Sequence, residues 1–209
     1  MNRRDVVFVV ADDGMMQMVR GFLGHPRAEQ RLQCGRFSFD PAADLVKAPN
    51  TDAGVYREAP NLLNDGFRAT HERAVVMLDA KFPGSPKAEQ IRTDISGRLE
   101  GVWQHYAVVV IEPELEAWLW QDNPNVAEAL DCPADFRSVL AQSGHWPHGQ
   151  AKPDDPKAAL EHLKRQHRAD ISNAAKRRLA ERISVKHCQD AAFTQLCAQL
   201  RIWFPLEQP

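Results

Sequence analysis

Three short runs of apolar residues stand out along the chain, at positions 6–10, 74–78 and 106–111. Each run is rich in valine, is apolar at consecutive positions and has an acidic residue within two positions of its end. Consecutive apolar residues suit strands that are buried on both faces, as in a parallel sheet covered by helices. The pattern therefore predicts three strands of a mostly parallel sheet.

Helical spacing appears directly after the first run and again between the second and third runs. After the first run it is carried by Met15, Met18, Val19, Phe22 and Leu23. Between the other two it is carried by Ile91, Ile95, Leu99 and Val102. Strand, helix and strand in this order predict a βαβ unit with a right-handed crossover.

Residues 36–56 are less regular. FSF at 37–39 is a candidate further strand, and the turn-rich PAADLVKAPNTDAG is either a loop or an edge hairpin. After the third strand, PELEAWLW and PNVAEAL each predict a helix with proline at its first position.

The character of the chain changes at about residue 131. A polar, proline-rich connector, HWPHGQAKPDDP, is followed by three helical patterns. These rest on Ala159, Leu160 and Leu163, then on Ala175, Leu179 and Ile183, and last on Phe193, Leu196, Cys197 and Leu200. We expect an α/β domain over residues 1–130, with helices on both faces of the sheet. A helical extension over 131–209 is expected to pack on it as one structural unit.

Composition narrows the classes of function. The net charge of −2 gives no overall basic footprint for nucleic acid, and no apolar run reaches the ~20 residues that span a membrane. The four cysteines are scattered without CxxC spacing, which favours reduced thiols in a cytoplasmic protein. GxSxG, GxxxxGK[ST] and GxGxxG are all absent from the sequence, which removes the commonest hydrolase and nucleotide-binding classes.

Acidic residues follow all three predicted strands: Asp12 and Asp13, then Asp79, then Glu112. Carboxyl ends of neighbouring parallel strands meet at one edge of a sheet, where ligands of open α/β folds bind. Two carboxylates about 4 Å apart repel by roughly 4 kcal/mol at an effective dielectric constant near 20, so such a cluster needs a proton or a divalent cation. Oxygen ligands favour Mg²⁺, Mn²⁺ or Ca²⁺ over zinc.

Two details of the acidic residues stay open at this point. If Glu112 caps a helix that begins at Pro113, Glu116 lies one turn further along the same side. A single acid at a helix start is also an ordinary cap, so Asp12 and Asp13 could simply begin the helix that follows them. The stretch VVFVVADDG resembles the opening of receiver domains as well, but Asp13 and Asp79 are too far apart in sequence for that fold.

The order of these acids, together with VVMLDAKFPGSP, EPELEAWLWQDNPNV and KPDDPKAALEHLKRQ, resembles the topoisomerase–primase (Toprim) fold. In particular, the chain looks like the small Toprim-like proteins of bacterial defence loci, among them the Toprim-like component of methylation-associated defence systems. The resemblance covers nearly the whole chain. It implies a component of an anti-phage or restriction-type system that works with other defence proteins and with DNA or RNA.

The same resemblance implies a Mg²⁺- or Mn²⁺-dependent site for phosphodiester cleavage. Asp79 matches the first acid of the DxD motif of these enzymes, and Asp12 or Asp13 lies near the position of their glutamate. Lys81 stands at the second acid position of DxD, where it could contact a phosphate instead. Glu112 and Glu116 are the candidates for the missing ligands beside Asp79. Because of Lys81, the alternative is a degenerate scaffold that binds a partner protein or nucleic acid.

The only locally basic region, KPDDPKAALEHLKRQHR with AAKRR nearby, includes Lys152 and Lys157. Its functional interpretation is contact with nucleic-acid phosphates, as for Lys81. The alternative is a solvated helix face whose charges are balanced by nearby aspartate and glutamate.

Overall fold

The computed structural model describes residues 3–121, 123–182, 188 and 190–206. Its centre is a four-stranded, all-parallel sheet in the order β2-β1-β3-β4. The strands are β1 (Arg4–Val10), β2 (Leu45–Lys47), β3 (His71–Asp79) and β4 (Tyr106–Ile111). The predicted fold class and all three predicted strands are confirmed.

The three apolar runs form the core of the sheet. Residues 6–10 and 74–78 are fully buried, because helices cover both faces of these central strands. The register pairs Val10 with Met77 and Asp79 with Ile111. The carboxyl ends of β1, β3 and β4 therefore lie side by side.

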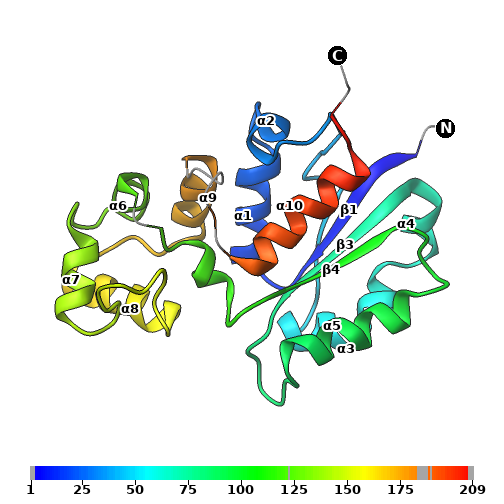
Figure 1. Ribbon diagram of the computed structural model, residues 1–209. Coiled ribbons are helices and arrows are strands. Elements are labelled where there is room, and N and C mark those ends of the chain that lie inside the picture. The colour runs from blue at the N-terminus through cyan, green and yellow to red at the C-terminus, as the bar shows by residue number, and fades with distance from the viewer. Residues whose placement is uncertain (1–2, 122, 183–187, 189, 207–209) are drawn as a thin grey trace.

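Helices pack on both faces of the sheet (Figure 1). One face carries α1 (Asp13–Leu23) and α10 (Ala191–Trp203), with α2 (Ala28–Leu32) at the end of α10. The other carries α3 (Thr51–Leu62) and α5 (Ala88–Leu99), with α4 (Asp65–Thr70) leading into β3. The helix expected between β3 and β4 is α5, so the predicted βαβ unit is confirmed.

The irregular segment 36–56 holds two elements that periodicity did not reveal. Residues 37–39, proposed as a strand, have irregular backbone, while the parallel edge strand β2 lies within the predicted loop or hairpin. Helix α3 then begins at Thr51. Three residues are too few to show a strand period, which is why β2 was missed.

The chain after β4 departs from the prediction. PELEAWLW was expected to be a helix from Pro113, but it contains only a 3-10 turn, Leu115–Trp118. The carbonyl oxygen of Pro113 accepts from the backbone N–H of Lys81, in the loop after β3, at 3.1 Å. The backbone thus stays tied to its neighbour strand beyond the sheet, and Glu114 keeps an extended conformation (φ −161°, ψ 165°).

The C-terminal helices form two groups. Helices α6 (Pro124–Leu130), α7 (Phe136–Gln142) and α8 (Pro156–His167) lie beside the sheet (Figure 1). Helix α9 (Asn173–Arg182) returns to α1, and α10 returns to β4. The three predicted helical patterns are confirmed as α8, α9 and α10, although Ile183 lies outside the described residues. Helix α6 begins at Pro124 as predicted, and α7 was not predicted.

Helices α1 and α9 are in unusually close contact. A Cβ atom on Gly21 would lie 2.6 Å from the Cβ of Ala180 and 2.7 Å from the carbonyl oxygen of Arg177. Only glycine fits this crossing, because any larger side chain would push α9 away from α1.

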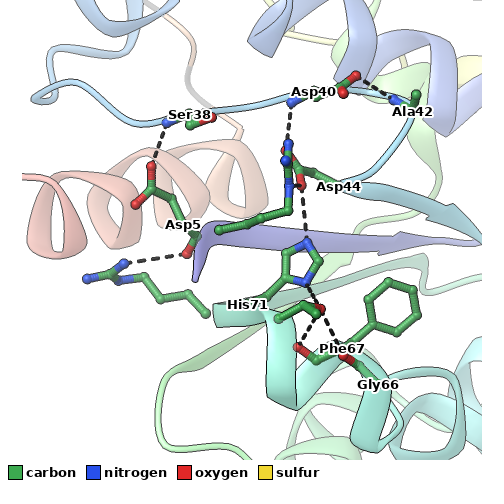
Figure 2. Close-up of polar contacts among 11 residues, drawn as sticks. Asp5, Ser38, Asp40, Ala42, Asp44, Gly66, Phe67 and His71 are labelled. Atoms are coloured by element: carbon green, nitrogen blue, oxygen red, sulfur yellow. Dashed lines mark hydrogen bonds and ion pairs between the residues drawn. The ribbon is translucent and has the colours of Figure 1, made fainter. Parts of the chain in front are cut away.

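A buried polar network lies at the amino ends of the strands (Figure 2). The carboxylate of Asp44, which is fully buried, accepts from Arg4 Nη2 at 2.8 Å and from the backbone N–H of Asp40 at 2.6 Å. His71 Nε2 lies 3.1 Å from the same carboxylate, and its Nδ1 lies 3.0 Å from the hydroxyl of Thr70. The network ties β1, β3 and the loop before β2 together.

No helix among the described residues is long and apolar enough to cross a membrane.

Candidate metal-binding site

Asp79 lies at the carboxyl end of β3, next to an acid that the sequence did not reveal. The Asp79 backbone N–H donates to Asp52 Oδ1 at 2.8 Å, and Asp52 belongs to the first turn of α3. Asp79 Oδ1 is buried, and within the described part of the chain nothing donates a hydrogen bond to it. Asp52 was missed because its helix begins inside the turn-rich segment, where no period marked it.

Asp12 and Asp13 have different roles. Asp12 is the N-cap of α1, where its Oδ1 accepts from the backbone N–H of Met15 at 2.8 Å. Its charge also acts on Asp79 and Asp52, so it is both a cap and a member of the acidic cluster. The side chain of Asp13 is 57% exposed and pairs with Lys47 at 3.0 Å.

The three glutamates after β4, which are Glu112, Glu114 and Glu116, lie in different environments. Glu112 is exposed and lines an open cleft with Lys81, Lys87 and Arg92. Glu114 is only 7% exposed, and its Oε1 finds no hydrogen-bond donor among the described residues. We call Asp12, Asp52, Asp79, Glu114 and Glu116 the acid site, because their charges act on one another.

The placement of Glu112 differs from the sequence expectation, which put it one helical turn from Glu116. That expectation depended on a helix starting at Pro113, and the extended backbone at Glu114 replaces it. Glu114 takes the buried position instead. A run of three alternating glutamates gave no signal for which of them would turn inward.

Glu116 is paired with a residue from the C-terminal extension. Lys176, in the first turn of α9, places its Nζ 2.8 Å from Glu116 Oε1, and both side chains are 12% exposed. Sequence distance hid this contact, because 60 residues separate the two.

Burial and repulsion from neighbouring acids raise the pKa values of Asp79, Asp52 and Glu114. The pKa of Asp79 rises to about 9, first because burial disfavours its charged form and then because of the charges of Asp52, Glu116, Asp12 and Glu114. Burial is also the largest cause that raises the pKa of Asp52, followed by the charge of Asp12. Burial and then Glu116 raise the pKa of Glu114, against the opposing charges of Lys157 and Lys81.

The acid site supplies oxygen donors without a preformed cage. Over the described ranges, no group of three or more His, Cys, Asp or Glu side chains is arranged to hold a metal ion. Mg²⁺ commonly keeps several waters and binds through one or two carboxylates plus substrate phosphates. The unpaired, buried oxygens of Asp79 and Glu114 fit that mode of binding.

The three lysines predicted to contact nucleic acid lie in different settings. Lys81 and Lys157 are exposed, and both act electrostatically on Glu114. Lys152 Nζ donates to the carbonyl oxygen of Ala117 at 2.5 Å and lies 3.6 Å from Asp190 Oδ2. Lys152 therefore fastens the connector before α8 to the turn after β4, while the other two face solvent beside the acid site.

Comparison of the chain with protein-family models, with curated proteins and with solved structures gave no match.

Proposed function

We propose that the chain is a cytoplasmic component of a prokaryotic anti-phage or restriction-type defence system. Its acid site would bind Mg²⁺ or Mn²⁺ and cleave a phosphodiester of DNA or RNA. The assignment to a defence system is supported by the resemblance of the sequence to Toprim-like proteins of such loci. The chemistry is supported by the residues themselves.

One observation carries the proposal. Burial, followed by the charges of four neighbouring carboxylates, raises the pKa of Asp79 to about 9, so near neutral pH this acid holds a proton that a divalent cation can replace. A cation bound there would polarise a phosphate and activate a water, and Asp52, whose Oδ1 accepts from the Asp79 backbone N–H at 2.8 Å, would orient that water. Lys81 and Lys157, both exposed beside Glu114, suit contact with flanking phosphates.

A second candidate function is a scaffold that binds a partner protein or nucleic acid without cleaving it. Two features favour it. Lys81 stands where a second acid of a DxD motif would be, and Glu116 is already neutralised by Lys176.

Mn²⁺ titration, followed by calorimetry at pH 8, separates the two functions. We expect wild-type protein to bind Mn²⁺ in the millimolar range or tighter, and to cleave single- or double-stranded DNA or RNA only when metal is present. Asp79→Asn removes the proposed ligand with almost no change of shape, and we expect it to abolish both binding and cleavage.

Asp13→Asn is the matched control, because it removes the exposed carboxylate next to Asp12 in sequence and leaves all five acids of the acid site in place. It should bind Mn²⁺ as the wild type does. Absence of Mn²⁺ binding to the wild type would refute the metal-dependent function. Metal binding without cleavage of any nucleic acid would favour the scaffold.

A further inference from the structure

The ammonium of Lys176 occupies a cation position inside the acid site. Besides its 2.8 Å contact with Glu116, the ammonium shares the space beside Gly14 with the carboxylate of Asp12. A Cβ atom on Gly14 would lie 2.9 Å from Lys176 Nζ and 3.2 Å from Asp12 Oδ1, so the ammonium and this carboxylate flank the same point. Glycine at position 14 leaves room for the lysine.

Lys176 is brought there by the packing of α9 and not by local helix chemistry. Ser172 caps α9, with its hydroxyl accepting from the backbone N–H of Ala175 at 3.2 Å. The close crossing at Gly21 then directs the first turn of α9 toward the start of α1. Helix dipoles disfavour a cation at both of these amino ends, so the attraction must come from the acids.

Among the described residues, Lys176 is the cation that forms an ion pair with the acid site. Of the five carboxylates in the acid site, Glu116 is the one that forms an ion pair with a described residue. Its partner is largely removed from water, which strengthens their attraction relative to that of an exposed pair. A divalent ion that approaches Glu116 or Asp12 must therefore displace this ammonium or bind beside its positive charge.

We propose that Lys176 is a tethered counter-ion that competes with the divalent cation, and that the C-terminal extension thereby sets the metal affinity of the acid site. This inference rests on the metal binding proposed above. Lys176 neutralises Glu116 and lies beside Asp12, so the metal binds at the other two aspartates, Asp79 and Asp52. There the positive charge of Lys176 weakens metal binding by repulsion. The extension thus contributes a residue to the site although it lies outside the α/β domain in sequence.

The test is the Mn²⁺ dissociation constant of Lys176→Met, measured by calorimetry at pH 8. Removing one positive charge from the site should lower Kd about tenfold or more. The double variant K176M/E116Q removes the pair without changing the net charge, so its Kd should stay within about threefold of the wild type. Lys176→Gln, which is neutral but can still donate to Glu116, serves if the methionine variant does not fold.

Lys47→Met is the matched control, because Lys47 pairs with the exposed Asp13 near the same end of α1. Its Kd should change much less than that of Lys176→Met, because solvent screens the exposed charge. An unchanged or higher Kd in both Lys176→Met and Lys176→Gln would overturn the inference while leaving the metal site in place. If neither the wild type nor any variant bound Mn²⁺, the proposed function would fail together with the inference.

Discussion

An aspartate lies at each end of the parallel strands: buried Asp44 at their amino ends and partly buried Asp79 at their carboxyl ends. The fold shifts the pKa values of these two acids in opposite directions. Burial alone would raise the pKa of Asp44, but hydrogen bonds from Arg4, the Asp40 backbone and His71 outweigh it and lower the pKa. At the carboxyl ends of the strands, Asp79 Oδ1 has no hydrogen-bond donor among the described residues, and burial followed by the charges of four other acids raises the pKa of Asp79 to about 9. Asp44 therefore has hydrogen-bond donors that hold it in its charged form, whereas Asp79 Oδ1 has none among the described residues.

The signs of their pH effects follow from these shifts. Asp44 contributes stability above its unfolded pKa near 3.8, and this is lost as the pH falls through its lower folded value. For Asp79 the relation is reversed. Its stability contribution is complete below pH 3.8 and is lost as the pH rises toward 9, because folding favours its protonated form.

The largest effect is expected from Asp44→Asn. This change leaves Arg4 and His71 facing a neutral amide in a buried network, so the free energy of unfolding at pH 7 should fall by about 2–4 kcal/mol. Urea denaturation measures it. A loss below about 0.5 kcal/mol would show that the amino-terminal network is not a structural lock.

Asp79→Asn makes the same chemical change at the carboxyl ends of the strands and should have the opposite sign. Wild-type Asp79 must take up a proton on folding at any pH between 3.8 and 9, whereas the amide is neutral in both states. In the absence of metal at pH 8, stability should therefore rise by about 1–3 kcal/mol. At pH 5 the gain should shrink, because taking up that proton then costs less free energy. Thermal unfolding at the two pH values provides the measurement, and equal or unfavourable shifts at both would contradict the raised pKa.

The smallest effect is expected from Lys47→Met at the exposed pair with Asp13. Solvent screens both charges, so stability should change by less than about 0.5 kcal/mol at pH 7. Urea denaturation at low and high salt checks this. A larger, salt-sensitive loss would place Asp13 in the acid site after all.

The sequence predicted the parts of the fold that carry a strong local pattern. Long valine-rich runs identified β1, β3 and β4, and apolar spacing identified α1, α5 and the helices α8 to α10. Short elements such as β2 gave no such signal, because a three-residue strand depends on the partner strand that it pairs with. The helix predicted at Pro113 failed for a related reason, since its carbonyl is bound by a neighbouring loop that local spacing cannot reveal.

The same division applies to the acid site. The sequence by itself placed acids at the ends of three strands, which marked Asp12 and Asp79, and it indicated that such a cluster needs a proton or a cation. Tertiary structure decided that Glu112 faces solvent and that Asp52 from α3 stands beside Asp79. It also brought Lys176 to Glu116 across 60 residues. These positions depend on how the helices pack on the sheet. The electrostatic energy of an acid is set by its burial and by its distance from other charges, and the residues next to it in sequence determine neither.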